Sequence, residues 1–236
     1  MDWMQKAVDS LTLTGDVRDY LLARGGRSEW ISSMQLRTWD SSMVEDLDAD
    51  FKSRFDPKRL DGMLCIPSFC PQGKIHGLEF RSIYKKLAMK HYGMRTKWNP
   101  VWVGIPGFTE KMYRGASVWI VEGLFDLFAM SWVVPDHHVI LSTERVGLTS
   151  AQLDFLFRWL QPSATVYVVY DNDEAGRNAV HTHEKDGVRK YGILDKLNRV
   201  GLNHIEVKYS GKDPGEIWDQ GGRELVRKAF AHVPTF

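Results

Sequence analysis

The sequence has few cysteines, no long apolar run and almost no net charge, and each shortage excludes a class of protein. Cys65 and Cys70 are the only cysteines among 236 residues. Two thiols are too few for a disulfide framework or a four-thiolate zinc site, and we expect both to be reduced. Without an apolar run long enough to span a bilayer, and with an acid-bearing start unlike a secretion signal, a cytoplasmic protein is expected. Because the net charge is only +1, a polyanion would have to bind to a local patch.

The first half of the chain mixes helical and strand patterns. Apolar residues recur at helical spacing from Thr14 to Arg24, with Thr14 placed to cap and Gly25 to end a helix. Residues 41–59 are first acidic and then basic, which suits a linker or a surface helix pair. The segments MLCIPSF and KIHGLEF flank Pro71-Gln72-Gly73 and predict a β-hairpin.

The second half alternates strands with helices. Strand patterns cover residues 117–121, 138–141, 164–170 and 205–209. Helices are expected over 124–132, from Thr149 with Gln152 completing a capping box, from Glu174 onward, and as two short segments at the end of the chain. The alternation predicts an α/β fold with a mostly parallel sheet flanked by helices. We therefore expect a smaller mixed α+β subdomain over residues 1–114 and an α/β domain over 115–236.

Acidic residues follow three of the predicted strands. Glu122-Gly123 ends the first, with Asp126 one helical turn later; Asp171-Asn172-Asp173 ends the third; Asp213 follows the fourth. The carboxyl ends of parallel strands meet at one edge of the sheet, where ligands of such folds bind. Packed carboxylates repel one another, and oxygen donors suit Mg²⁺ or Mn²⁺ better than zinc. The alternative is that Asp171 and Asp173 only cap the next helix.

Two further patterns bear on this edge. Gly123 is expected to allow a sharp turn beside Glu122, and Gly176 a close approach of the next helix to the sheet. His181 and His183, expected on that helix, cannot share one of its faces at this spacing, so metal ligation by them is not expected.

A basic and aromatic segment precedes the acidic strand ends. Between Glu79 and Asn99 the only acid is Glu79, whereas the cations and rings are Phe80, Arg81, Tyr84, Lys85, Lys86, Lys90, Tyr92, Arg95, Lys97 and Trp98. Cations bind phosphates and aromatic rings stack on unpaired bases, as in a groove for single-stranded nucleic acid. The alternative is a solvated basic surface. The other tryptophans are expected in the core.

The strand that ends in Glu-Gly and the later D-x-D-x-x-G motif resemble the Toprim domain, which occurs in DnaG-type primases, topoisomerases, recombination mediators and OLD-type nucleases. Motifs elsewhere resemble the primase branch, in matching order over about residues 16–222. They comprise Tyr20-Leu21 with Arg24-Gly25, the hairpin ending at Arg81, Lys97-Trp98-Asn99, Leu148 to Gln152, and Lys212-Asp213-Pro214.

The resemblance implies a DNA primase core that makes short RNA primers on single-stranded DNA from ribonucleoside triphosphates. It implies Glu122, Asp171 and Asp173 as catalytic residues, with Asp126 and Asp213 as further ligands of Mg²⁺ or Mn²⁺. It also implies nucleotide or nucleic-acid contacts by Arg81, Lys97, Asn99, Lys111 and Lys212. Gly215 stands where the family often has Asp, which puts one metal contact in doubt, with Glu216 as a substitute.

Other Toprim functions remain as alternatives. An OLD-like nuclease would use the same acids to hydrolyse DNA, and a recombination mediator would need no intact acid set. A topoisomerase needs further strand-passage domains. Because two cysteines cannot form a zinc ribbon, we expect an excised core or a compact primase of the kind phages encode, aided by a helicase or a separate zinc-bearing module.

Overall fold

The computed structural model describes residues 3–45, 47–84, 91–95, 101–144 and 147–233. The chain divides into two compact units, one made of residues 1–23 and 27–106 and the other of residues 24–26 and 107–236. None of the helices in the described ranges is both long and apolar enough to cross a membrane.

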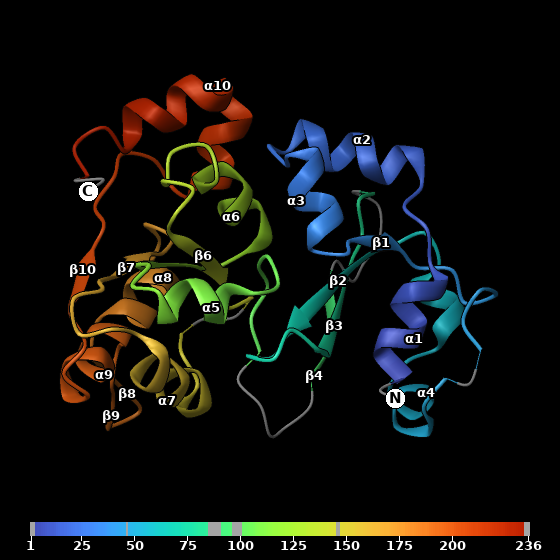
Figure 1. Cartoon of the computed structure of the whole chain (residues 1–236), viewed down its shortest axis with the longest axis horizontal. Helices are drawn as coiled ribbons and strands as arrows, with labels where there is room; N and C mark the ends of the chain where they lie inside the picture. The colour runs from blue at the N-terminus through green and yellow to red at the C-terminus, as the bar shows by residue number, and fades with distance from the viewer. Residues whose placement is uncertain (1–2, 46, 85–90, 96–100, 145–146, 234–236) are drawn as a thin grey trace. The chain divides into compact units, whose positions relative to one another are not determined.

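The first unit contains a four-stranded antiparallel sheet in the order β1-β2-β3-β4 (Figure 1). The strands are β1 (Arg37–Thr38), β2 (Leu64–Phe69), β3 (Ile75–Arg81) and β4 (His91–Arg95). The predicted hairpin is confirmed as β2 and β3, with Cys65 opposite Phe80. The helical segments are α1 (Trp3–Ser10), α2 (Gly15–Ala23), α3 (Ser28–Ser33), α4 (Ala49–Arg54) and the short 3₁₀ helix η1 (Pro57–Leu60).

An aromatic cluster forms the core of this unit. The Trp39 ring lies edge-on to Phe80, with 4.9 Å between the ring centroids, and Phe51 lies 5.5 Å from Trp39. All three side chains are fully buried, and each such ring contributes a large apolar area. Phe51 belongs to α4, so residues 41–59 contain short helical segments, one of which supplies a core side chain. Cys65 and Cys70 are free and buried.

The second unit contains a four-stranded parallel sheet in the order β10-β7-β5-β6. Its strands are β5 (Val118–Val121), β6 (Val139–Ser142), β7 (Val166–Val169) and β10 (His204–Glu206). Every residue of β5, β6 and β7 is buried, as expected for strands covered on both faces. Trp119 and Tyr167 stack on neighbouring strands with 4.2 Å between their centroids. The predicted α/β fold with a parallel sheet is confirmed.

The first helix of this unit precedes β5, and each later helix follows a strand (Figure 1). Thr149 and Gln152 form the predicted capping box. The helices are α5 (Phe108–Tyr113), α6 (Leu124–Met130), α7 (Ser150–Trp159), α8 (Glu174–Val180), α9 (Ile193–Arg199) and α10 (Pro214–Ala229). Helices α6 and α10 pack side by side.

Two element predictions were wrong in detail. Helix α8 ends at Val180, so His181 and His183 do not lie on it, and His183 instead begins the hairpin of β8 (His183–Lys185) and β9 (Val188–Lys190). Strand β10 ends at Glu206 rather than at residue 209. The two short helices expected at the end of the chain are confirmed, because α10 consists of two helical segments separated by a kink with non-helical backbone at Gly221 and Gly222.

Candidate active site

Two carboxylates lie where the order of the sheet reverses direction. The chain passes from β5 to β6 on one side of β5, then to β7 on the other side and outward to β10. Ligands of open parallel sheets bind in the crevice at such a switch point, outside the carboxyl ends of the strands. Glu122 follows β5 directly and Asp171 follows β7 by one residue. The two residues therefore lie at the edge of the sheet predicted from sequence.

Glu122 is a partly buried carboxylate in a negative environment. Burial is the largest cause that raises its pKa, to about 7, followed by the charges of Asp171, Asp173, Asp213 and Glu144. Within the described part of the chain, its Oε2 atom is buried and accepts no hydrogen bond. A buried oxygen without a donor is unfavourable, so a proton or a cation at this atom would stabilise the site.

Asp171 and Asp173 differ in their local roles. Asp173 caps α8, because its Oδ1 accepts a 2.9 Å hydrogen bond from the Gly176 amide. Asp171 does not act as the cap. Burial, followed by the charges of Asp213 and Asp173, raises the pKa of Asp171 to about 6. Helix capping therefore accounts for one member of the motif and leaves Asp171 available for another role.

Asn172 ties the turn after β7 to the loop before α10. Its side-chain amide donates to the carbonyl oxygens of Tyr209 at 3.1 Å and Gly211 at 2.7 Å. Its backbone amide donates to the carbonyl oxygen of Lys212 at 2.7 Å. These bonds hold Asp171 near Asp213, so Asn172 positions the acids. This role was not predicted, although Asn172 is the middle residue of the D-x-D motif.

Asp213 caps α10, with 2.6 Å between its Oδ1 and the Glu216 amide nitrogen. Lys212 Nζ lies 3.6 Å from Asp213 Oδ2 and is largely exposed. The charge of Asp213 is the largest cause that raises the Lys212 pKa. Lys212 thus presents a cation at the rim of the acidic cluster.

Asp126 has a structural role that its position in the sequence did not reveal. It is buried, and its two carboxylate oxygens accept hydrogen bonds from the amides of Gly123 at 3.0 Å and Gly215 at 3.1 Å. The carboxylate therefore joins the turn after β5 to the beginning of α10. Burial, with Asp171 and Asp213, raises its pKa to about 8 against the opposing effect of these hydrogen bonds.

Two of the glycines have tight surroundings. A Cβ on Gly176 would lie 2.1 Å from the Asp171 carbonyl oxygen, which confirms the predicted close approach. A Cβ on Gly215 would lie 3.2 Å from Phe125 Cβ and 3.3 Å from Asp126 Oδ1. Little room is therefore left for the Asp that the resembled family often has at this position. The chain bends at Glu122 and Gly123 as predicted, but Gly123 has extended backbone with φ −130° that other residues also adopt.

Glu144 is a further acid that the sequence analysis missed. It follows β6, and its Oε1 accepts a 2.8 Å hydrogen bond from the Ser142 hydroxyl, which also lies 2.9 Å from the Glu122 carbonyl oxygen. The rule applied to the other strand ends would have found it, because it stands two residues after the end of β6.

The predicted cationic residues do not all reach this edge. Lys111 Nζ donates to the Asp136 carbonyl oxygen at 3.0 Å, next to the amino end of β6 and therefore at the opposite edge of the sheet. Arg81 is the last residue of β3 in the first unit. Lys97 and Asn99, like Trp98, lie outside the described residues.

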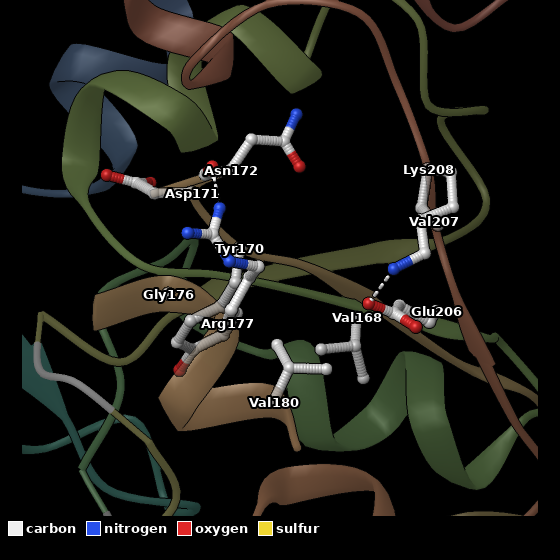
Figure 2. Close-up of a pocket in the computed structure, with 10 residues that line it drawn as sticks. All are labelled: Val168, Tyr170, Asp171, Asn172, Gly176, Arg177, Val180, Glu206, Val207 and Lys208. Carbon is white, nitrogen blue, oxygen red and sulfur yellow. Dashed lines mark hydrogen bonds and ion pairs between the residues drawn. The ribbon is translucent and has the colours of Figure 1, made fainter. Parts of the chain in front are cut away.

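A small pocket of about 60 Å³ lies between β7, α8 and β10 (Figure 2). Arg177 Nη1 donates to the Asn172 carbonyl oxygen at 2.6 Å, and Lys208 pairs with Glu206, which also contacts His181 Nε2 at 2.9 Å. The Asp171 carboxylate extends away from the Glu206–Lys208 pair. These interactions connect the elements around the pocket, and we assign it no ligand.

The donor set of the sheet edge fits a hard divalent cation. Its side-chain donors are carboxylate oxygens whose mutual repulsion a cation would relieve, and Glu122 Oε2 is an orphaned buried acceptor. As the side chains stand in the described residues, no group of three or more His, Cys, Asp or Glu is close enough to hold an ion. The site therefore fits a divalent cation in the chemistry and the charge of its donor atoms.

Comparisons with known proteins identify this fold. Residues 119–217 match a family model described as Toprim-like. A search of curated proteins finds no match. The structure is similar to the Aquifex aeolicus primase with its zinc-binding and RNA polymerase domains, at 20% identity and a TM-score of 0.70 over 97% of this chain and 59% of that chain.

Two further solved structures are similar over the same share of the sequence. The RNA polymerase domain of Mycobacterium tuberculosis primase DnaG matches at 17% identity and a TM-score of 0.64, over 97% of this chain and 80% of that chain. A DnaG primase catalytic domain bound to single-stranded DNA matches at 15% identity and 0.64, over 97% and 77%. This chain therefore has the fold of DnaG primase catalytic cores, and residues 119–217 of its second unit are similar to the Toprim-like family.

Proposed function

We propose that this chain is a DnaG-type primase catalytic core that synthesises short RNA primers on single-stranded DNA. The observation that carries the proposal is that 97% of the chain, including the first unit, matches primase cores, whereas a Toprim-like segment by itself covers residues 119–217. One of those cores was crystallised with single-stranded DNA and another with double-stranded DNA.

In this proposal the carboxylates hold the metal ions of nucleotidyl transfer. Glu122, Asp171, Asp173 and Asp213 would hold Mg²⁺ or Mn²⁺, with one oxygen of Asp173 and one of Asp213 already engaged as caps. When bound, paired ions stabilise the attacking and leaving oxygens of an in-line displacement. Asp126 positions the site, because both of its oxygens bind backbone amides.

The other residues act on protons and phosphates. Glu122 is also proposed to accept the proton of the primer 3′-hydroxyl, because it directly follows β5 at the edge where the acids gather. The exposed Lys212 would contact the triphosphate of the incoming ribonucleotide. Arg81, Lys97 and Asn99 are proposed as further nucleotide or template contacts, and Lys111 is not, because it lies at the opposite edge of the sheet.

The test is to incubate the protein with single-stranded DNA, labelled ribonucleotides and Mg²⁺ or Mn²⁺, and to resolve the products. New oligoribonucleotides are expected, and shortened template without synthesis would indicate a nuclease instead. Asp171→Asn and Asp173→Asn should each reduce synthesis at least roughly 100-fold, since metal stabilisation contributes several kcal/mol. The matched control is Asp154→Asn, a surface acid of α7 that pairs with Arg158.

A further inference from the structure

A hollow of about 270 Å³ in the first unit combines cations with an apolar floor. It lies among α2, α3 and the beginning of β1, and it is lined by Leu13, Ile31 and Leu36 together with Arg18, Arg37, Ser28 and Ser32. Arg18, Ser28 and Ser32 are exposed, and Ile31 and Leu36 are buried. The polar groups therefore surround an opening whose base is hydrophobic.

The lining contains hydrogen-bond donors and no carboxylate. Asp16, near Arg18 in sequence, is already engaged, because its two carboxylate oxygens accept hydrogen bonds from Thr14 and Tyr84. Within the described ranges, no acid forms an ion pair with Arg18 or Arg37. The hollow thus has two guanidinium groups that, among the described residues, form no ion pair with an acid.

Arg37 is held in place for binding. Its Nη1 atom donates to the Leu36 carbonyl oxygen at 3.0 Å, which orients the guanidinium and leaves most of its five N–H donors free for a ligand. An oriented guanidinium loses less conformational entropy on binding than a freely rotating one.

We propose that this hollow binds a backbone phosphate of a nucleic-acid strand, between Arg18 and Arg37. Guanidinium groups bind phosphate oxygens in pairs of hydrogen bonds, and the Ser28 and Ser32 hydroxyls add donors. The lining includes no aromatic ring on which a base could stack, which favours a phosphodiester over a free nucleotide. The proposal rests on the proposed function in taking the ligand to be nucleic acid, but it does not involve the metal site.

The experiment measures binding of labelled oligodeoxythymidine by fluorescence anisotropy in EDTA, with salt varied between about 50 and 200 mM. Arg18→Ala and Arg37→Ala are each expected to weaken binding about tenfold. Each should lower the log–log salt slope by roughly 0.7, and the double variant by about twice that. The control is Arg59→Ala, an exposed cation of the same unit that pairs with Asp56.

A conservative variant separates the effect of charge from that of guanidinium geometry, and a second probe separates a nucleic-acid strand from a free nucleotide. Arg37→Lys keeps the charge but loses the planar fork, so it should retain the salt slope and bind more weakly than wild type. Labelled ATP without DNA tests the free nucleotide. If the alanine variants reduce ATP binding but leave DNA binding intact, the strand assignment is overturned.

Wild-type DNA affinity and salt slope in the double alanine variant would overturn the proposal altogether. Because the assay contains no divalent metal and measures no synthesis, that outcome would leave the proposed function untouched. Conversely, normal primer synthesis by Asp171→Asn would contradict the proposed function without affecting this binding result.

Discussion

At the scale of single residues, some acids of the sheet edge have both carboxylate oxygens hydrogen-bonded, and others have a buried oxygen that accepts no hydrogen bond. Both oxygens of Asp126 bind backbone amides, whereas Glu122 has a buried oxygen without a donor. Side chains of one chemical type therefore differ in what their removal should do to stability.

Asp126→Ala should destabilise the protein strongly. The substitution leaves the buried Gly215 amide and the partly buried Gly123 amide without acceptors, and an unsatisfied buried group costs about 1–3 kcal/mol. We expect the free energy of unfolding, measured with urea, to fall by roughly 2–4 kcal/mol, against little change for the surface variant Asp154→Ala. A loss below about 1 kcal/mol would mean that the carboxylate does not join these two turns.

The raised pKa values predict how the stability of the metal-free protein depends on pH. Asp171 and Glu122 titrate at about 6 and 7 when folded, against 3.8 and 4.5 ordinarily. The folded state therefore favours their protonated forms, and this stability is present below about pH 4 and is lost as the pH rises through 6 and 7.

Thermal melting in EDTA should show this loss directly. Between pH 5 and 8 we expect a decrease of roughly 4–8 °C in Tm, from about 2 kcal/mol after allowance for solvent screening. Glu122→Gln should flatten the dependence, and millimolar Mg²⁺ should restore stability at the alkaline end. A Tm in EDTA that is constant or rises over this interval contradicts the electrostatic description of the site.

Which site residues could be predicted depended on their spacing in the sequence. Glu122, Asp171 and Asp213 were predicted to share one edge because each follows a recognisable strand. The contact of Asp126 with Gly215 could not be predicted, because it joins two distant segments whose pairing depends on the packing of α6 against α10. Arg18 and Arg37 were missed for a similar reason, since an isolated arginine in a helix or short strand carries no pattern.

At the scale of elements, periodicity predicted the buried strands well and the exposed ones poorly. β5, β6 and β7 are continuous apolar runs, which is the signal of a strand covered on both faces. The hairpin of β8 and β9 was missed because it is polar and almost entirely exposed. Its first residues were predicted instead to continue α8.

The exposure of this hairpin predicts that it contributes little to stability. A two-stranded sheet without a buried face is marginal in water. Replacing residues 183–190 by two glycines should therefore change the Tm by less than about 3 °C, measured by thermal melting. Thr182, which accepts from the Gly192 amide at 3.1 Å, should be retained. A decrease of about 10 °C would show that the hairpin packs on something beyond the contacts described.

At the scale of the whole molecule, the contacts that we propose with nucleic acid would form with strands of many different base sequences. Phosphate contacts position a strand but do not read its bases. We predict that the isolated chain binds single-stranded DNA weakly and that oligonucleotides of different sequence bind with affinities within about threefold of one another. Anisotropy with a panel of oligonucleotides measures this.

A partner should then raise efficiency by raising the local concentration of template. We expect a helicase or a zinc-bearing module, added in trans, to increase primer yield more than a further increase in template does. Efficient priming by the chain alone at one short defined sequence would contradict this expectation and would mean that some part of it reads bases directly.

The segment of residues 24–26 has a consequence for how the chain folds. Arg24 pairs with Asp219 at 2.8 Å, and the Gly25 carbonyl oxygen accepts from Trp132 Nε1 at 2.8 Å. The first contact joins positions 219 − 24 = 195 residues apart, so it closes a loop that contains nearly the whole polypeptide. Closing so long a loop has a large entropic cost before any contact compensates for it. We therefore expect the second unit to be completed late in refolding, after the segments between these two positions have become compact, and during synthesis Arg24 cannot meet Asp219 until residue 219 has left the ribosome.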